Sequence, residues 1–487
     1  MISRRVHPAY SLEIVVSDRH LEQVARIAAE MTGPVVVADD HHPERGWTRL
    51  VLLTDGEQHL HELESRLRTR LDFHLVYCED RVLARSRGGK TKTSSSVPLE
   101  NAEDLALAYT PGVGRVSTLI AADPTQVNDL TGRANRVAVV TDGSAVLGLG
   151  NIGPLAALPV MEGKAALFAR LAGIEAVPIC LDTQDVDEIV TAVTAIAPAF
   201  GGINLEDISA PRCFAVEERL REVLDVPVIH DDQHGTATVV LAALLNALRI
   251  TGKSLQTARI VVVGAGAAGT AVARLLLAAG AGDVTVWAPV GVLHPDLAKQ
   301  LPDHKNWLAR HTNPRGIQGG LAQALTDADA VVGVSAPGVL TRDLIKKMAK
   351  DPIVFALANP EPEIDPDEIA DLAAVVATGR SDYPNQVNNA LAFPGLFRGV
   401  LGHNRATLDE EVFIAAGHAL ADLTTSPSSP QRLLPDIFDP RVVGAVAGAV
   451  QETLSRRSSP PPAGAVDTAN TSTATAQDPP AQGEPHA

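Results

Sequence analysis

The stretch from Gly201 to Thr236 constrains the fold of this chain more than any other. It reads as a strand, a helix and a second strand, with Glu206 and Asp207 at the end of the first strand and Asp231 and Asp232 at the end of the second. In a parallel βαβ unit, the carboxyl ends of both strands lie side by side at one edge of the sheet. Up to four carboxylates therefore converge on one crevice, and such oxygen ligands suit Mg²⁺ or Mn²⁺ better than zinc.

A single acidic residue at a strand end is as often a turn or helix-cap residue as a ligand. Two pairs at matching strand ends, the second followed by Gln233-His234-Gly235-Thr236, favour a metal site. Cys213 and His234 are expected to be bystanders, because hard cations prefer carboxylates and water. Glu206 and Asp207 are adjacent and would point to opposite faces of a regular strand. Both can bind one ion only if the chain leaves strand geometry there.

The overall composition narrows the class of protein. With 487 residues, the chain is long enough for about three domains. Its content of 45% hydrophobic but only 3% aromatic residues suits α/β layers. The formal net charge of −17 argues against nucleic acid or an anionic membrane as a partner. A small anionic substrate must then be held by local cations or by a metal.

The cysteines and the apolar runs bear on the compartment. Cys78, Cys180 and Cys213 are widely spaced, leave no disulfide framework and fit a reducing environment. No apolar stretch reaches about 18 residues without a polar interruption, and the first residues lack the apolar core of a secretory signal. We therefore expect a soluble, cytoplasmic protein without a membrane partner.

Residues 1–84 predict a small α+β domain in which strands and helices follow one another in the order βαββαβ. The expected strands are 10–16, 35–38, 48–53 and 73–78, and the expected helices are 21–31 and 59–71. This ferredoxin-like order resembles the ACT regulatory domain. ACT domains often bind amino acids or mediate pairing, but nothing in the sequence identifies a ligand, so a structural or oligomerising role is favoured. A basic, Gly/Ser-rich linker over 85–97 follows.

Residues 98–240 predict an α/β domain whose apolar strands alternate with helices, which is typical of a parallel sheet covered on both faces. A glycine-rich run over 146–153 lacks the spacing of a dinucleotide loop and indicates close backbone approach to a ligand. Lys164 falls in a helix expected over 159–172, where a lysine on its own is usually solvated. Tyr109 falls in a turn, where a lone tyrosine most often serves packing.

Residues 241–400 predict a doubly wound Rossmann domain, reached through a long apolar helix over 236–251. A strand over 259–263 leads into Gly264-Ala-Gly-Ala-Ala-Gly269, a helix and a further strand over 284–287. A bare G-x-G-x-x-G is weak on its own, but in this context it indicates dinucleotide binding, with the pyrophosphate at the helix amino terminus. Three more strands are expected over 330–334, 353–357 and 374–377.

The end of the second Rossmann strand lacks the usual acidic residue that holds the adenosine ribose. That end reads Trp287-Ala288-Pro289-Val290, and no Arg or Lys follows until Lys299. The choice between NAD and NADP is therefore poorly signalled. NAD is favoured only because no Arg or Lys side chain near this strand end could bind the 2′-phosphate of NADP.

The carboxyl-terminal part completes the domain organisation. An amide-rich loop over 381–389 supplies neutral donors and acceptors suited to carboxylate recognition. Closing helices are expected within 401–456. A tail over 457–487, rich in Pro, Ala, Ser and Thr, is expected to be disordered.

Nine motifs, in order and spread over residues 97–456, resemble those of bacterial malic enzyme: YTPGV, TDGSAVLGLGNIGP, GKAALF, INLEDISAPRCF, HDDQHGTA, GAGAAG, VSAPG, ALANP and SDYPNQVNN. The resemblance implies an α/β catalytic domain, a Rossmann NAD(P)-binding domain and a homodimer or higher homo-oligomer. It implies oxidative decarboxylation of (S)-malate to pyruvate and CO₂, with Mg²⁺ or Mn²⁺ and with NAD, or NADP, as oxidant.

The resemblance also implies roles for individual residues. Glu206, Asp207 and Asp232 would bind the metal, while Asn359 and Asn388 would bind substrate carboxylate. The residues that would bind the nucleotide are Gly264, Gly266, Ala267, Ala268, Gly269, Ser335, Ala336 and Asn359.

Three further residues would carry the proton transfers. Lys164 would act as general base, Tyr109 as general acid that protonates C3, and Asp231 would interact with Lys164. A lysine accepts a proton only when neutral, so the metal charge and partial burial should depress its pKa, while Asp231 opposes that shift.

Three positions depart from the family pattern. Ala288 stands where relatives carry Asp, which should weaken or relax nucleotide recognition, and Ala145 stands where larger eukaryotic relatives carry Arg, so the binding of the second malate carboxylate is incompletely explained. Gly114 replaces an Ala, with little expected effect. The alternatives are an oxaloacetate decarboxylase or malolactic-type enzyme with weak nucleotide selectivity, and a catalytically idle regulatory subunit.

Overall fold

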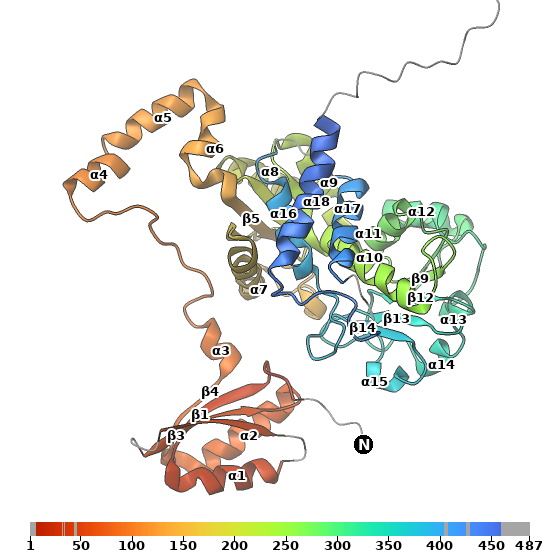
Figure 1. Cartoon of the computed structure of the whole chain (residues 1–487), viewed down its shortest axis with the longest axis horizontal. Coiled ribbons are helices and arrows are strands. Elements are labelled where there is room, and N and C mark those ends of the chain that lie inside the picture. The colour runs from red at the N-terminus through yellow and green to blue at the C-terminus, as the bar shows by residue number, and fades with distance from the viewer. Residues whose placement is uncertain are drawn as a thin grey trace, which may run out of the picture.

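The computed structural model describes residues 6–458, except for 32, 34, 43–45, 404–407 and 425–428. It contains three sheets, one for each predicted domain, and a group of carboxyl-terminal helices (Figure 1). The catalytic and nucleotide-binding parts are α/β with parallel sheets, as the sequence predicts.

The amino-terminal unit has the predicted βαββαβ order of elements. Its sheet has the strand order β2-β3-β1-β4, with antiparallel neighbours throughout. The elements are β1 (Ser11–Ser17), α1 (Leu21–Ala29), β2 (Val36–His42), β3 (Trp47–Leu53), α2 (Glu57–Leu71) and β4 (Leu75–Asp80). Leu12, Ile14 and Val16 alternate along β1 and are buried against the two helices, because successive side chains of a strand point to opposite faces.

An arm joins this unit to the catalytic domain. It consists of α3 (Arg81–Ser86), an irregular segment, α4 (Ala102–Ala108), α5 (Gly112–Ala122) and α6 (Val127–Leu130). Helices α4 and α5 stand away from the rest of the chain (Figure 1). Neither helix has a buried residue.

The catalytic domain is built on a four-stranded parallel sheet with the order β6-β5-β7-β8. Its elements are β5 (Arg136–Thr141), α7 (Pro154–Leu167), β6 (Glu175–Cys180), α8 (Val186–Ile196), β7 (Gly202–Leu205), α9 (Arg212–Val223) and β8 (Val228–His230). The helices α8 and α9 bury their apolar side chains against one face of the sheet, and α7 packs on the other. This covering on both faces explains why the strands are apolar throughout.

Helix α10 (Asp231–Thr251) starts directly after β8, earlier than the start at Thr236 expected from the sequence. Asp231 and Asp232 therefore occupy the first helical turn instead of a loop. By length and composition α10 could cross a membrane, but 67% of its apolar window is buried within the fold. We interpret it as the central core helix, packed between the catalytic sheet and the next domain.

The nucleotide-binding domain has the predicted Rossmann sheet, with the order β11-β10-β9-β12-β13-β14. All neighbouring strands are parallel except β11, which pairs antiparallel with β10. The strands are β9 (Arg259–Val263), β10 (Asp283–Ala288), β11 (Gly291–Val292), β12 (Ala330–Gly333), β13 (Ile353–Ala356) and β14 (Val375–Thr378). The helices are α11 (Ala267–Ala278), α12 (Asp303–His311), α13 (Leu321–Leu325), α14 (Arg342–Ile345) and α15 (Pro366–Ile369).

Three carboxyl-terminal helices return to the catalytic half of the protein: α16 (Phe393–Val400), α17 (Glu410–Asp422) and α18 (Arg441–Ser458). They lie beside α9 and α10 in Figure 1. Helix α18 continues past the predicted end of order at residue 456, because Arg457 forms ion pairs of 2.6 Å with Asp409 and Glu411. The remainder of the predicted disordered tail, residues 459–487, lies outside the described residues.

Candidate active site

Three carboxylates converge at the carboxyl edge of the catalytic sheet. Glu206 and Asp207 follow β7, and Asp232 follows β8 in the first turn of α10. One oxygen of each lies within 4.8 Å of the other two, and no other group of three or more His, Cys, Asp or Glu residues in the described part of the chain comes together in this way. Cys213, the expected bystander, is buried in the apolar layer under α9.

The backbone at Asp207 explains how adjacent residues serve one site. Strand β7 ends at Leu205, and Asp207 has a φ of 54°, in the left-handed region that side chains other than Gly rarely adopt. The chain has thus left strand geometry, as two ligands in succession require. Two hydrogen bonds fix this conformation: the Asp207 N–H donates to Asp232 Oδ2 at 2.8 Å, and the Ala145 N–H donates to the Asp207 carbonyl at 2.9 Å.

The electrostatics of the three carboxylates fit a divalent cation. Burial raises the pKa of Asp207 and of Glu206 above their ordinary values; the neighbouring carboxylates add to this rise, and the Lys164 ammonium opposes it. Asp207 Oδ2 is buried and has no hydrogen-bond partner among the described residues. Buried carboxylates at this spacing repel one another, and a hard cation would relieve that repulsion while satisfying the free oxygen.

Lys164, on α7, is the cation beside this cluster. Its Nζ lies 2.5 Å from Asp231 Oδ2 and 2.9 Å from Glu206 Oε1, and 4.1 Å from the centre of the Phe393 ring. The side chain is only 7% exposed, so the general expectation of a solvated lysine does not hold here. Burial lowers its pKa, but Asp231 and Glu206 outweigh burial and raise the pKa above its ordinary range.

The predicted contact of Asp231 with Lys164 is therefore present. Asp231 is fully buried, and its Oδ1 has no hydrogen-bond partner among the described residues. Burial raises the pKa of Asp231, while the Lys164 ammonium opposes that rise. Asp231 thus differs from the three clustered carboxylates: it faces the lysine rather than the space between them.

The dinucleotide loop has the predicted geometry. Gly264 follows β9 with a φ of 120°, and a Cβ there would lie 2.4 Å from the Val334 carbonyl, so only glycine fits. Helix α11 begins at Ala267, which presents its free N–H groups at the loop, where a pyrophosphate would bind. The strand order changes direction between β9 and β12, and ligands of such sheets bind at that point.

The expected ribose position is apolar in the structure as well as in the sequence. Ala288 ends β10, is 1% exposed and packs in the main apolar cluster. Ala288 pairs with Gly291 across a tight turn made by Pro289 and the exposed Val290. The turn therefore offers a nucleotide neither an acidic nor a basic side chain.

Glu363 is a residue that the sequence interpretation missed. It is fully buried and accepts hydrogen bonds from the Ser335 N–H at 2.7 Å, the Ser335 hydroxyl at 3.2 Å and the Ala358 N–H at 3.0 Å. It thereby ties the loop after β12, which carries Ser335 and Ala336, to the loop after β13, which carries Asn359. A glutamate three residues after ALANP gave no separate signal in the sequence.

The two predicted substrate amides lie at the junction of the domains. Asn359 is exposed after β13, and its backbone carbonyl approaches the catalytic domain so closely that a Cβ at Gly148 would lie 2.0 Å from it. Asn388 caps a short helical turn, with its Oδ1 accepting the Ala390 N–H at 2.9 Å. Its neighbour Asn389 lies beside Gly235 and so near Asp231.

Tyr109 is not brought to the other predicted site residues. It lies at the end of α4, on the arm that stands away from the catalytic domain, and it is 66% exposed. No contact between Tyr109 and Lys164 is present among the residues that the structure describes. Within one chain, the site therefore has the proposed base but lacks the proposed acid.

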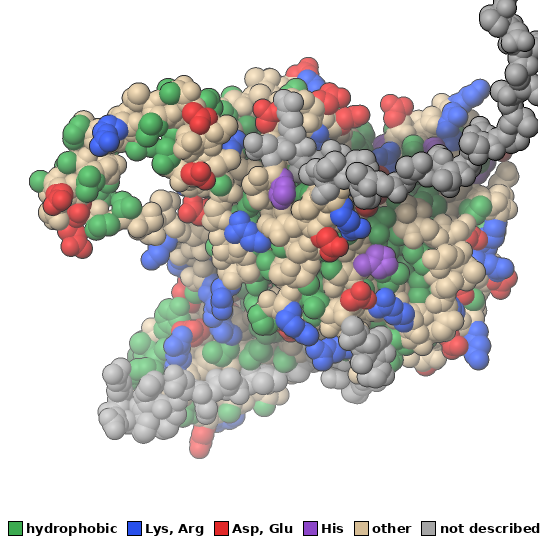
Figure 2. All heavy atoms as spheres, turned by 45° about the horizontal axis from the view of Figure 1, so that its top comes forward, with side chains coloured by type: hydrophobic (Ala, Val, Ile, Leu, Met, Phe, Trp, Pro, Cys, Tyr) green, Lys and Arg blue, Asp and Glu red, His purple; other side chains and the backbone are tan. Residues whose placement is uncertain are grey.

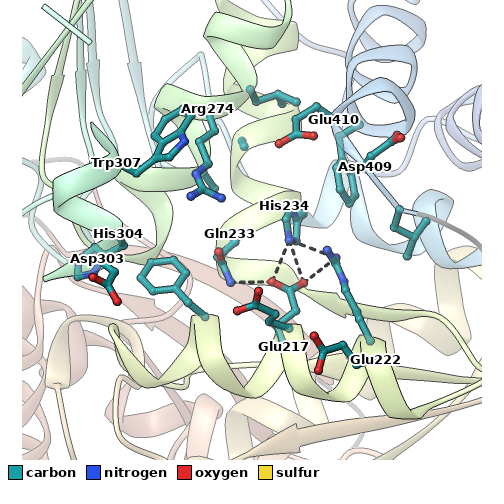
Figure 3. Close-up of a pocket in the computed structure, with 18 residues that line it drawn as sticks. Glu217, Glu222, Gln233, His234, Arg274, Asp303, His304, Trp307, Asp409 and Glu410 are labelled. Carbon is teal, nitrogen blue, oxygen red and sulfur yellow. Dashed lines mark hydrogen bonds and ion pairs between the residues drawn. The ribbon is translucent and has the colours of Figure 1, made fainter. Parts of the chain in front are cut away.

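A cavity of about 770 Å³ lies between α9, α10, α11, α12 and α17 (Figure 3). Glu217, Gln233 and His234 line it, whereas Lys164 and the three clustered carboxylates do not. His234 stacks on Phe413 with ring centres 4.5 Å apart, which agrees with its expected place outside the metal ligands. The cavity is thus distinct from the crevice that the carboxylates face.

Comparisons with known proteins agree with this arrangement. The chain matches the family models described as "Malic enzyme, N-terminal domain" over residues 88–221 and "Malic enzyme, NAD binding domain" over residues 233–454. It is 52% identical over 383 residues to an NAD-dependent malic enzyme of Geobacillus stearothermophilus, covering 78% of this chain and 80% of the relative. It is 51% identical over 364 residues to a bifunctional malic/malolactic enzyme of Bacillus subtilis, covering 74% and 89%. Among solved structures, an NAD-dependent malic enzyme of Thermotoga maritima superposes with a TM-score of 0.74 at 46% identity, covering 77% of this chain and 99% of that one. Neither family model covers the amino-terminal unit.

Proposed function

The chain belongs to the malic enzyme family and is an NAD(P)-dependent malic enzyme; from this premise we propose that Glu206, Asp207 and Asp232 hold the divalent cation of the reaction. The observation that carries this proposal is the convergence of three carboxylates, two of them buried, beside a buried lysine and a Rossmann domain. The reaction is oxidative decarboxylation of malate to pyruvate and CO₂ with reduction of the nucleotide.

The proposed division of labour follows from the contacts. When bound, Mg²⁺ or Mn²⁺ supplies a Lewis acid at the C2 oxygen of malate. Lys164 accepts the proton of the 2-hydroxyl as the C2 hydride passes to the nicotinamide, and it can do so only when neutral. Glu206 cannot serve a cation and Lys164 equally, so once Glu206 is a ligand Lys164 keeps only Asp231 as its counter-charge. This loss lowers the lysine pKa towards the range in which it acts as a base.

Substrate and nucleotide are held from the opposite side of the crevice. We propose that Asn359 and Asn388 bind a malate carboxylate through their amide N–H groups, since the Asn388 oxygen is already occupied by the Ala390 N–H. We propose that the nucleotide lies on Gly264, Gly266, Ala267, Ala268 and Gly269 with Ser335 and Ala336 beside it. NAD is favoured only weakly over NADP, because the turn after β10 has no polar group that distinguishes them.

A direct assay tests the proposed function. Purified protein with Mn²⁺, malate and either nucleotide should reduce the nucleotide and form pyruvate, and Lys164→Ala should lose about 10²-fold or more in rate, as expected for a general base. A wild-type rate no higher than that of Lys164→Ala would contradict the proposal.

A second candidate function is malolactic or oxaloacetate-decarboxylating activity, with either weak nucleotide selectivity or a tightly retained nucleotide. It is suggested by the apolar ribose position and by the bifunctional relative of Bacillus subtilis. Lactate formed from malate without net nucleotide reduction would indicate the malolactic reaction. Pyruvate formed from oxaloacetate without nucleotide would indicate the decarboxylase.

We further propose that the protein works as a homodimer in which the arm of each chain completes the site of the other. The support is the exposed position of Tyr109 together with an uncovered apolar surface. On the arm, Leu107 is 71% exposed, and Leu105 and Leu119 are also exposed; on the catalytic domain, Leu155 is 87% exposed. Figure 2 shows the arm standing off the body with its apolar side chains uncovered. A second copy is the partner that would bury both surfaces and supply the missing acid.

We also propose that the amino-terminal unit is an ACT-like domain and that the enzyme is cytoplasmic. The βαββαβ order and antiparallel sheet support the first proposal, and the cysteine usage supports the second. Calorimetric titration with the twenty amino acids would test the first: binding that disappears when residues 6–84 are removed would support a regulatory domain.

A further inference from the structure

A chain of hydrogen bonds runs from Glu217 on α9 to His230, which lies next to the carboxylates proposed to bind the metal. The Glu217 carboxylate accepts hydrogen bonds from the His230 backbone N–H at 3.0 Å and from the Gln233 side-chain amide at 2.9 Å. The same amide nitrogen lies 3.0 Å from His230 Nδ1. His230 Nε2 lies 3.3 Å from Asp232 Oδ2, within ion-pair distance, and has no hydrogen-bond partner among the described residues. The outer end of this chain, with Glu217 joined to Gln233 and His234, is visible in Figure 3.

Glu217 is held as a carboxylate. It is 5% exposed and lies 2.7 Å from Arg221 and 2.8 Å from His234. Burial raises its pKa, but His234 and Arg221 outweigh burial and hold the pKa of Glu217 below its ordinary range. An anionic carboxylate is an acceptor only, so every group that faces it must donate.

The donor and acceptor roles along the chain then follow one from another. Because Glu217 only accepts, Gln233 must present its nitrogen rather than its oxygen. The second hydrogen of that nitrogen points at His230 Nδ1, so Nδ1 must be the acceptor. The imidazole proton is therefore on Nε2, which faces Asp232. In proteins, the hydrogen bond made by one imidazole nitrogen usually decides whether the other nitrogen carries the proton.

We propose that Glu217 and Gln233 are positioning residues for the metal site, which fix His230 as an N–H donor to the metal ligand Asp232. The proposal rests on the metal site proposed above. In this arrangement Asp232 Oδ2 accepts the Asp207 N–H and faces His230 Nε2 at 3.3 Å, which leaves Oδ1 available to a cation. Groups that orient metal ligands from behind change metal affinity by about 10- to 100-fold when they are removed.

The test is Mn²⁺ affinity, measured on the full-length protein from the EPR signal of free Mn²⁺ without malate or nucleotide. Glu217→Gln and Gln233→Leu should each raise the Kd for Mn²⁺ by about 10- to 100-fold. Glu217→Gln alters the network at its origin, whereas Gln233→Leu removes the hydrogen bond to Glu217 and the link to His230 but leaves the ion pairs of Glu217 in place. Gln233→Leu therefore keeps the test valid even where Glu217→Gln does not fold.

Two control variants separate positioning from general stability. Glu218→Gln makes the same charge change at the exposed neighbouring residue and should leave the Kd within twofold of wild type. Arg219→Met removes the ion pair that α9 forms with Asp187 at 2.6 Å and does not contact Glu217, so it should leave the Kd within twofold of wild type.

The outcomes are distinguishable. A Gln233→Leu Kd within twofold of wild type, or an Arg219→Met Kd raised as far as that of Gln233→Leu, would overturn the positioning role while leaving the metal site intact. A wild-type protein that binds no Mn²⁺ would overturn the proposed metal site itself, and the positioning role with it.

Discussion

Two inactive variants should restore activity when they share one dimer. Tyr109→Phe removes the proposed acid from the arm, and Lys164→Ala removes the proposed base from the buried site. Each variant alone should lose about 10²-fold or more in turnover, as expected for a lost general acid or base. If the arms are exchanged, a mixed dimer has one site with both substitutions and one site with neither.

The expected magnitude follows from this geometry. Random association of equal amounts of the two variants gives mixed dimers in about half of cases, each with one intact site of two, so about a quarter of wild-type activity returns. Selecting the mixed dimers raises that figure to about half. If Tyr109 served the site of its own chain, every site in a mixed dimer would carry one substitution, and no activity would return.

The assay uses coexpression of the two variants with different affinity tags and purification over both columns. NADH formation from malate and Mn²⁺ is then measured per mole of dimer, next to wild type carrying the same two tags. Doubly selected protein with no more activity than the separate variants would refute the exchange of arms. A dimer mass by light scattering is the matching control, since a monomeric protein would refute it as well.

Three other predictions follow from single features of the structure. In wild-type enzyme, kcat/KM should differ less than about tenfold between NAD and NADP. Ala288→Asp should shift this preference towards NAD by about fivefold, through a new hydrogen bond worth about 1 kcal/mol. An unchanged preference would show that the missing acidic side chain is not the explanation. Glu363→Gln should raise KM for the nucleotide about fivefold, because Gln keeps only one of the two side-chain oxygens that accept the Ser335 and Ala358 N–H groups. Glu361→Gln, at an exposed position of the same loop, should leave KM unchanged. Truncation after Ser458 should leave turnover and Tm unchanged, whereas truncation before Arg456 should lower Tm by about 1–4 °C through loss of the Arg457 ion pairs; equal Tm values would show that these pairs contribute nothing.

Much of the fold and of the site could be predicted because both depend on local patterns. Alternating apolar runs and helices define the two parallel sheets, and the carboxyl ends of adjacent strands bring Glu206 and Asp232 together whatever the intervening sequence. The G-x-G-x-x-G loop likewise needs only its flanking strand and helix. These features are consequences of chain connectivity, which the sequence states directly.

The rest depends on contacts that connectivity does not specify. The left-handed backbone at Asp207 is fixed by two hydrogen bonds, one donated by its N–H to Asp232 and one accepted by its carbonyl from Ala145, and both residues are distant in the sequence. The early start of α10 places Asp231 in the first helical turn, whereas the polar residues around it led to the prediction of a loop. The exposed position of Tyr109 was hardest to foresee, because the YTPGV motif identifies the residue but not its place in the fold.

Helix α10 joins the two halves of the enzyme without a break. Its first turn carries Asp231 and Asp232, and its later turns lie in the core shared with the nucleotide-binding domain. Each residue of an α-helix advances the chain by about 1.5 Å and turns it by about 100°. A single insertion or deletion in the middle of α10 would therefore rotate the nicotinamide crevice by over a quarter turn about the helix axis, away from the carboxylates. Catalytic and nucleotide-binding halves from different relatives should combine into an active enzyme only where their splice preserves the phase of this helix.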